Sequence, residues 1–378
     1  MSAPPASAPP IELTALLRHL VARRDLSCSQ ARDLLAAMLA GQTSEAEIAA
    51  ILVALAMKGE TIEELTGFAQ AMRAAVRPLP APAAALDLAG TGRFALEAAD
   101  AGGTAPGGLV DTCGTGGDAS GTFNISTAAA LIAAGCGLRV AKHGNRSLSS
   151  RCGSADVIEA LGAVVDLPAA ATVQCLTATG IGFFFAPAWH PAMRHVQPVR
   201  RALRIRTVFN LLGPLTNPAG AAAQVIGVYA PEWTAKLAAA LLALGAHRGF
   251  VVHGQDGLDE FTTTAPTLVA EVRDEEVRTY AFDAQEYGLA RATRADLEGG
   301  DAAANAAIIR LILEGELGPR RDIAVLNAAA ALIAAGPDAA DDPWPAALAR
   351  AEHALDSGAA LRRLEALVAF TRAAAAGR

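Results

Sequence analysis

The segment Gly114–Thr127 holds residue types that can bind phosphate groups, with four glycines among its first eight residues. It follows Leu109–Asp111, which predicts a short strand, and it leads into Ile125–Ala134, which predicts a helix. Glycines at such a turn let backbone N–H groups approach a phosphate closely, and the N-terminus of the helix adds a favourable partial charge. The side chains of Asn124 and Ser126 add donors near the start of the helix.

Three interpretations of this turn compete, and the plainest is a glycine-rich turn with helix caps. A dinucleotide-binding fingerprint is met loosely by Gly114, Gly116 and Ala119. That fingerprint also needs an acid about 20 residues on, at the end of the second strand, for the ribose hydroxyl. Here the second predicted strand ends at Lys142, and a cation suits a phosphate instead. The nucleotide-binding P-loop fails because no Gly-Lys-Ser/Thr closes the turn. The pattern therefore favours a phosphate-binding turn of another type.

A second polar segment, Lys142–Ser147, follows the next predicted strand. Lysine is scarce in this chain, since Lys58 and Lys236 are the only others, and so a lysine here indicates a compact positive charge. A further polar segment, Ser149–Asp156, precedes another predicted helix and could present N–H groups to an anion. Either segment could be an ordinary solvated loop. Loops after neighbouring strands nevertheless meet at the carboxyl edge of an open α/β sheet, where such folds bind ligands.

Two adjacent acids, Asp259 and Glu260, follow a further predicted strand in a glycine-containing segment. Magnesium takes oxygen ligands and is usually held by one or two carboxylates together with substrate phosphates and water. This acidic pair fits that requirement. Taken in isolation, the two residues could equally be solvated surface acids.

The chain around these segments alternates between short apolar runs and helical patterns. The runs that predict strands are Leu109–Asp111, Leu138–Ala141, Val164–Asp166, Ile181–Phe185, Gln224–Tyr229 and Gly249–Val252. Thr267–Val272 and Val277–Tyr280 predict a hairpin, and alanine-rich helices follow it. The alternation predicts an α/β fold with a mainly parallel central sheet flanked by helices.

The N-terminal part of the chain lacks this alternation of strands and helices. Residues 1–10, rich in Pro, Ala and Ser, predict a disordered tail. Residues 11–77 predict a small all-helical domain, in which Ser44 with Glu47 and Thr61 with Glu64 form capping boxes. Residues 78–108 are dominated by Pro, Ala, Gly and Thr and predict a linker or a long surface loop.

Composition excludes several classes of protein. The net charge of −7 gives no basic footprint for nucleic acid. The five cysteines are odd in number and contain no C-x-x-C pair, which argues against a disulfide scaffold and for reduced thiols in the cytoplasm. The first ten residues carry no basic region before an apolar run, as a signal peptide would, and no uncharged stretch is long enough to cross a membrane.

Taken in order, these segments resemble the anthranilate phosphoribosyltransferase family over roughly residues 11–375. Any one block of matching residues is weak evidence for the family, whereas the six blocks in order are specific evidence for it. The blocks are Gly114–Asp118 with Thr122–Thr127, Lys142–Ser147, Gly153–Gly162, His190–Asn210, Leu211–Pro218 and His253–Glu260.

The resemblance implies a small helical domain, 11–77, completed by a segment near 187–210, and a large domain, 109–186 with 211–378, that binds phosphoribosyl pyrophosphate (PRPP). It also implies a homodimer formed through the helical domain. PRPP would be bound by Gly114, Gly117, Asp118, Thr122, Asn124, Ser126, Thr127, Lys142 and Ser154. Anthranilate would be bound by Gly114, His143, Asn145, Arg200, Gly213 and Pro214. Two Mg²⁺ ions would be held by Ser126, Asp259 and Glu260.

The implied reaction is transfer of the phosphoribosyl group of PRPP to the amine of anthranilate, with release of pyrophosphate, as the second step from chorismate to tryptophan. Lys142 and magnesium would stabilise the leaving group, and Arg200 would anchor the anthranilate carboxylate. A neutral arylamine already carries a lone pair, so we assign no general base. On the charge and hydropathy of the chain given above, neither nucleic acid nor a membrane is expected as a partner.

This chain departs from the family pattern at two residues. Ala119 and Arg204 both stand where the family usually has glycine, which matters wherever a positive φ is needed. Two alternatives remain open: a pyrimidine nucleoside phosphorylase of the same fold, which would use free phosphate, and a non-catalytic relative that binds nucleic acid. The second predicts basic surface clusters and a degraded glycine turn.

Overall fold

The computed structural model describes residues 12–80, 108–118, 120–147, 151–336 and 342–377. The described chain divides into two compact units, a helical unit of residues 12–75 with 192–212 and an α/β unit of residues 76–191 with 213–377. The sequence placed the corresponding boundaries at 77/78, 186/187 and 210/211. The predicted tail 1–10, most of the predicted linker 78–108 and Ala119 lie outside the described residues.

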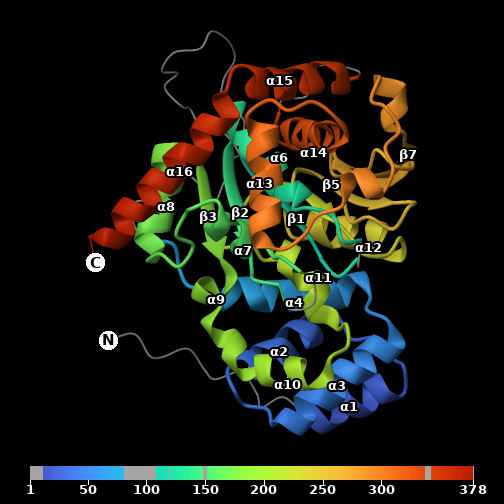
Figure 1. Cartoon of the computed structure of the whole chain (residues 1–378). Coiled ribbons are helices and arrows are strands. Elements are labelled where there is room, and N and C mark those ends of the chain that lie inside the picture. The colour runs from blue at the N-terminus through green and yellow to red at the C-terminus, as the bar shows by residue number, and fades with distance from the viewer. Residues whose placement is uncertain (1–11, 81–107, 119, 148–150, 337–341, 378) are drawn as a thin grey trace. The chain divides into compact units, whose positions relative to one another are not determined.

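Four consecutive helices and a later segment form the helical unit (Figure 1). The helices are α1 (Leu13–Val21), α2 (Cys28–Leu39), α3 (Glu45–Lys58), α4 (Ile62–Ala74) and α10 (Gln197–Leu203). The predicted capping boxes open α3 and α4, and a third box, Ser27 with Gln30, opens α2. Helices α2 and α4 approach closely at Gly67, where an added Cβ would lie 2.2 Å from the Cys28 carbonyl oxygen.

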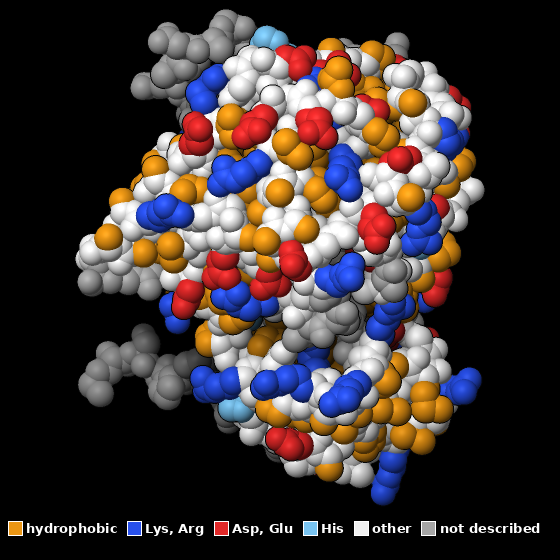
Figure 2. Space-filling model, viewed as in Figure 1, with side chains coloured by type: hydrophobic (Ala, Val, Ile, Leu, Met, Phe, Trp, Pro, Cys, Tyr) orange, Lys and Arg blue, Asp and Glu red, His pale blue; other side chains and the backbone are white. Residues whose placement is uncertain are grey.

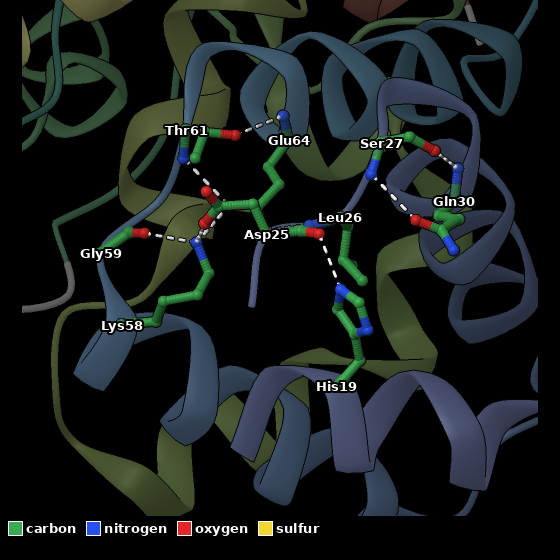
Figure 3. A network of polar contacts seen from close by, with 9 residues as sticks. All are labelled: His19, Asp25, Leu26, Ser27, Gln30, Lys58, Gly59, Thr61 and Glu64. Carbon is green, nitrogen blue, oxygen red and sulfur yellow. Dashed lines mark hydrogen bonds and ion pairs between the residues drawn. The ribbon is translucent and has the colours of Figure 1, made fainter. Parts of the chain in front are cut away.

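A buried ion pair ties the loops of this unit together (Figure 3). The Lys58 ammonium donates to Glu64 at 2.8 Å and to Asp25 at 2.7 Å. The Glu64 carboxylate also accepts from the backbone N–H groups of Leu26 and Thr61, both at 2.9 Å. Lys58 and Glu64 are buried while Asp25 is exposed, so the Glu64 carboxylate is the centre of the network.

The α/β unit is built on a seven-stranded sheet in the order β3-β2-β1-β4-β5-β6-β7. The strands are β1 (Leu109–Gly114), β2 (Arg139–Gly144), β3 (Ile181–Phe185), β4 (Ala223–Gly227), β5 (Arg248–Gly254), β6 (Thr267–Arg273) and β7 (Glu276–Phe282). Strands β1 to β5 pair in parallel, and β6 and β7 form the predicted antiparallel hairpin beside β5. The sheet is therefore mainly parallel, as predicted. The chain leaves β1 for β2 on one side and later pairs β4 on the other, which makes the carboxyl end of β1 a topological switch point.

Helices cover the sheet (Figure 1). The helices of the α/β unit are α6 (Ile125–Gly135), α7 (Ser154–Ala160), α8 (Ala169–Thr179), α9 (Ala186–Trp189), α12 (Glu232–Ala243), α13 (Ala302–Leu313), α14 (Pro319–Ala335), α15 (Trp344–Asp356) and α16 (Ala359–Ala376), and the chain of α11 (Val208–Leu215) passes from the helical unit into this one. Three short 3₁₀ turns complete the described elements: η1 (Pro191–His195), η2 (Ala284–Tyr287) and η3 (Ala295–Leu297).

Alternate strand residues enter two separate cores. Val110 and Val140 face the larger core, which contains α6 and α14, whereas Leu109 and Ala141 face a smaller core with α8. Because a strand turns successive side chains to opposite faces, both faces of the sheet must be covered, and these apolar runs are buried on both sides. The middle of the larger core is made of alanines on α6 and α14, whose small side chains let the two helices pack closely.

One predicted strand is wrong. Val164–Asp166 is an irregular connection between α7 and α8. The Val164 N–H is satisfied by the hydroxyl of Thr371 on α16 at 3.1 Å, and the Leu167 N–H bonds back to Val165, so no neighbouring strand is needed.

The surface charge and the hydropathy of the helices are relevant to whether nucleic acid or a membrane is a partner. On the face shown in Figure 2, acidic and basic side chains are interspersed over the α/β unit and do not gather into one basic surface. Among the described residues, no helix has the length and apolar character needed to cross a membrane. All five cysteines are free.

Candidate active site

The glycine-rich turn lies between β1 and α6. Gly116 and Gly117 have φ values of 66° and 77°, a left-handed conformation that costs side-chain-bearing residues energy. The Gly116 N–H donates to Asp259 Oδ2 at 3.0 Å, and the Thr115 N–H donates to the Gly227 carbonyl at 2.8 Å. The turn is therefore held both by its own conformation and by the loop that follows β5.

The acidic pair approaches this turn closely because two strand ends lack side chains. A Cβ on Gly114 would lie 2.5 Å from Asp259 Oδ2. A Cβ on Gly227, at the end of β4, would lie 1.5 Å from the Asp259 carbonyl oxygen. Glycine is required at both positions by the proximity of the loop.

Glu260 reaches the start of α6. Its Oε1 accepts from the Ser126 N–H at 3.1 Å, a position that the dipole of the helix favours for an anion. The Lys142 ammonium lies nearby and donates to the Thr112 carbonyl at 2.6 Å and to Ser126 Oγ at 3.3 Å. Ser126, Lys142 and Glu260 thus lie together at the start of α6. The Lys142 side chain, only 2% exposed, is more buried than a solvent-facing phosphate ligand would be.

Like charges crowd this region. Burial raises the pKa of Asp259 well above its usual value, and the neighbouring carboxylates of Asp118 and Glu260 raise it further. Burial raises the pKa of Glu260 to about 8, against the opposing charge of Lys142. Burial also lowers the pKa of Lys142, although the nearby acids partly offset this.

This donor set fits magnesium. The described residues contain no group of three or more histidine, cysteine or acidic ligands that would form a complete protein site. Magnesium usually needs only one or two carboxylates and takes its other oxygens from substrate phosphates and water. A divalent cation would stabilise these two adjacent carboxylates, whose pKa values are raised and which lie beside a hydroxyl and a phosphate-type turn.

The second predicted loop is joined to the start of α7. Asp156 accepts from the N–H groups of Ser147 and Gly153 at 3.1 and 2.8 Å. The Ser154 hydroxyl donates to the Asn145 carbonyl at 3.4 Å, and a Cβ on Gly144 would lie 2.2 Å from that hydroxyl. Hydrogen bonds therefore tie the residues at the carboxyl end of β2 to the N-terminus of α7.

His143 belongs to a buried chain of polar groups. Its Nε2 lies 3.2 Å from Nε2 of His190, and its backbone N–H donates to Asp111 Oδ1 at 3.2 Å. The other oxygen of Asp111 accepts from Asn217 Nδ2 at 2.7 Å. Burial, together with the mutual proximity of the two rings, lowers the pKa of His143 to about 3, and burial lowers that of His190 to about 4. Both imidazoles are neutral at pH 7.

The remaining predicted residues are placed as follows. Asp118 Oδ1 accepts from the Ser120 N–H, and Thr122 Oγ1 lies 3.2 Å from Ser120 Oγ. Thr127 is fully buried on α6. The carbonyl of Gly213 accepts from the Thr216 hydroxyl at 3.2 Å, and that of Pro214 accepts from Gln224 at 2.8 Å.

Arg200 belongs to the helical unit, on α10. Its guanidinium carbon lies 5.1 Å from the centroid of the Phe209 ring, a cation–π contact. Arg204, the residue that departs from glycine, ends this helix with φ 53° and ψ 28°, so the left-handed cap expected of glycine is adopted by an arginine.

Sequence reasoning missed several residues that hold the site together. Asp111 and Asn217 join β1 to the loop after α11, and His190 pairs with His143. Asp111 had a visible signal, a charged residue inside an apolar strand, whereas the contact of Asn305 with Asn124 had none.

Comparison with known proteins identifies the family to which this fold belongs. The model of a glycosyl transferase family α/β domain matches residues 106–361, and the model of that family's helical bundle domain matches residues 14–76. The anthranilate phosphoribosyltransferase of Moorella thermoacetica is 49% identical over 364 residues, which cover 96% of this chain and 100% of that protein. The enzyme of the same name from Solibacter usitatus is 49% identical over 354 residues, 94% of this chain and 97% of the relative.

The chain belongs to the anthranilate phosphoribosyltransferase family. It is accordingly an enzyme, a pentosyltransferase. The crystal structure of the family member from Thermus thermophilus superposes with a TM-score of 0.81 at 44% identity, covering 94% of this chain and 99% of that one. The structure of the Saccharomyces cerevisiae member in complex with PRPP and magnesium gives a TM-score of 0.81 at 25% identity, covering 96% and 98%. The helical and α/β domains of the family are those predicted from the sequence.

Proposed function

We propose that this enzyme transfers the phosphoribosyl group of PRPP to the amine of anthranilate, giving N-(5-phosphoribosyl)anthranilate and pyrophosphate, the second step from chorismate to tryptophan. The full-length similarity to relatives of that name supports the reaction. The observation that carries the proposal is the convergence of the glycine turn and the acidic pair, through the bonds of Gly116 to Asp259 and of Ser126 to Glu260.

PRPP is a dense polyanion and needs N–H donors and cations. We assign it to the turn between β1 and α6 and to the loop after β2. The proposed contacts are Gly114, Gly117, Asp118, Thr122, Asn124, Ser126, Thr127, Lys142 and Ser154. The left-handed conformation of Gly116 and Gly117 at the turn, and the position at the end of a parallel strand, support this assignment.

Magnesium would be held by Asp259, Glu260 and Ser126, with two ions in each site. When bound, it neutralises charge on the pyrophosphate that departs. The raised pKa values of the two acids support this, because a cation relieves the repulsion that raises them. The yeast relative was solved with PRPP and magnesium together.

Anthranilate would be bound through its carboxylate by Arg200, since a guanidinium matches a carboxylate with two parallel hydrogen bonds. The walls of its pocket would be Gly114, His143, Asn145, Gly213 and Pro214. The neutral state of His143 at pH 7 suits a wall that faces an aromatic ring and an amine. A related structure, from yeast, contains 4-fluoroanthranilate.

In the reaction, the bond between ribose C1 and the pyrophosphate oxygen breaks, the amine nitrogen bonds to C1, and the nitrogen then loses a proton. Catalysis rests on alignment of the amine behind C1 and on stabilisation of charge on the leaving group. Lys142 adds a fixed positive charge beside Ser126 and Glu260. No general base is assigned, because the arylamine is neutral before attack.

We further propose a homodimer formed through the helical unit, and a location in the cytoplasm. The five free thiols suit a reducing compartment. Size-exclusion chromatography with light scattering would test the dimer.

Anthranilate fluorescence tests the function directly. It should disappear when enzyme, PRPP and magnesium are all present, and it should persist when any one of them is omitted. The purified product should carry one phosphoribosyl group by mass spectrometry. Persistence of fluorescence in the complete mixture would refute the proposal, and cleavage of uridine or thymidine by phosphate would favour the nucleoside phosphorylase instead.

A further inference from the structure

The segment Leu297–Gly299, to which the sequence analysis assigned no role, is hydrogen-bonded to the end of the glycine turn. The Phe123 N–H donates to the Leu297 carbonyl at 3.2 Å, and the Gly299 N–H donates to the Gly121 carbonyl at 2.9 Å. Between these bonds, Thr122 and Glu298 form an antiparallel bridge. The segment before α13 therefore lies along the end of the turn as a short strand would.

The first turn of α13 then adds a side chain. Asn305 is 1% exposed and lies behind Asn124, which is partly exposed. Asn305 Oδ1 accepts from the Gly300 N–H at 2.7 Å, and Asn305 Nδ2 donates to Asn124 Oδ1 at 2.9 Å. Asn124 Nδ2 donates in turn to the Cys152 carbonyl at 3.3 Å.

The hydrogen bonds from Gly300 through Asn305 and Asn124 to Cys152 form a relay. Each end of the relay is a backbone group that can act only as a donor or only as an acceptor. A backbone N–H can only donate, so Gly300 must face the oxygen of Asn305. A backbone carbonyl can only accept, so Cys152 must face the nitrogen of Asn124. These two constraints agree on one polarity for the Asn124 amide, with its oxygen turned inward to Asn305 and its NH₂ group turned the other way. Among the described residues, only Cys152 accepts from that NH₂ group, which keeps one N–H for a ligand.

We propose that Asn305 is a positioning residue for PRPP, which fixes the Asn124 amide so that an N–H, and not the carbonyl oxygen, faces a phosphate oxygen of the substrate. This inference rests on the proposed function, because it takes Asn124 to contact PRPP. An amide free to rotate would present its oxygen part of the time and repel the anion. The relay also links the turn after β1 to Cys152, next to Gly153 at the start of α7, so that the two phosphate loops are held in register.

Two substitutions of Asn305 separate the effect of its hydrogen-bond direction from the effect of its packing. Asn305→Ala removes both hydrogen bonds and should raise the Kd for magnesium-PRPP about tenfold, the cost of an unfixed hydrogen bond to a charged group. Asn305→Asp keeps the size and the bond from Gly300 but cannot donate. Asn124 must then turn its NH₂ inward and its oxygen toward the substrate, so Asp should be worse than Ala. Calorimetric titration with magnesium-PRPP measures each Kd, and kinetics should show the same rise in the KM for PRPP with little change in that for anthranilate.

A double-mutant cycle tests whether Asn305 acts through Asn124. In an Asn124→Ala background, neither Asn305→Ala nor Asn305→Asp should weaken magnesium-PRPP binding further. A charge effect of the new aspartate, or a general loosening of the loop, would persist in that background and would overturn the proposal. Ile309→Val, buried one turn further along α13, is the matched control for stability and should leave the Kd unchanged.

The outcome is separable from that of the proposed function. Wild-type enzyme that binds magnesium-PRPP but does not consume anthranilate would refute the transferase reaction while the cycle still tests the relay. Wild-type enzyme that consumes anthranilate, with Asn305→Asp binding PRPP normally, would overturn the relay alone.

Discussion

Gly227 lies so close to Asp259 that a Cβ on the glycine would be 1.5 Å from the aspartate carbonyl oxygen. Gly227→Ala must therefore displace the backbone that carries the acidic pair. We expect a loss of at least about 3 kcal/mol in the free energy of unfolding, the upper range for overpacking, and loss of turnover. Urea denaturation and the fluorescence assay measure the two effects. Gly377→Ala, where a Cβ meets only an ordinary contact of 3.7 Å, is the control. Normal activity in Gly227→Ala would contradict this packing.

Asp259→Asn should stabilise the metal-free protein while it removes activity. The folded state raises the pKa of this carboxyl, so the charged form is disfavoured on folding, and its cost grows as the pH rises above the unfolded value of about 3.9. At pH 7 the variant should melt at a higher temperature than wild type, and the difference should vanish toward pH 4. Added magnesium should stabilise wild type more than the variant. Glu365→Gln, on the exposed face of α16, should change none of these. A lower melting temperature for Asp259→Asn would argue against the crowding of charges.

The two buried histidines predict acid sensitivity. Their pKa values of about 3 and about 4 lie below the value of about 6.5 in the unfolded chain, so the unfolded state binds more protons as the pH falls. Stability should be unaffected above pH 6.5 and should decline below it, by about 1.4 kcal/mol per pH unit for each histidine. His190→Gln should make that decline about half as steep between pH 6 and 4.5. The control is His247→Gln, at an exposed position.

Arg204→Gly should stabilise the helical unit. The arginine occupies a left-handed helix cap at φ 53°, where glycine has no Cβ penalty. After the greater entropy of an unfolded glycine is allowed for, the gain should be about 0.5 to 1 kcal/mol. Arg201→Gly, within the same helix, should instead cost about 1 kcal/mol. Thermal unfolding of both variants compares the two, and equal losses would mean that the cap is not strained.

The network around Glu64 should show the difference between buried and exposed ion pairs. Lys58→Met leaves the buried Glu64 carboxylate without its cation and should cost about 3 to 5 kcal/mol. Asp25→Asn removes only the exposed partner and should cost less than about 1 kcal/mol. Chemical denaturation gives both values. Similar small losses would indicate that Glu64 is stabilised by the N–H groups of Leu26 and Thr61 alone.

Much of the fold follows from local patterns. The turn residues between β1 and α6, the capping boxes of α3 and α4 and the β6–β7 hairpin are each encoded within a few residues, and each was predicted. Val164–Asp166 was mistaken for a strand because two valines followed by an aspartate carry no information on whether a partner strand is available. The bond that satisfies its N–H comes from Thr371, 207 residues away.

The candidate site, like the fold, could be predicted only in part from the sequence. The convergence of the glycine turn, Lys142 and the acidic pair could be predicted because each lies at or just beyond the carboxyl end of a strand of one sheet. The supporting contacts could not, since the bond between Asp111 and Asn217 spans 106 residues and that between Asn124 and Asn305 spans 181. A buried asparagine looks like any other in the sequence, and only its neighbours in space give it a role.

The pairing of the turn after β1 with the loop after β5 has a consequence for the order of folding. The bond from Gly116 to Asp259 joins residues 143 apart in the chain, and β4 lies between the strands that precede them. Contacts of such long range form late, because the entropy of closing the loop is lost before they are gained. A nascent chain that ends before β5 would carry the phosphate turn without the acids, so competence for metal-assisted chemistry must arrive only when most of the protein has been synthesised.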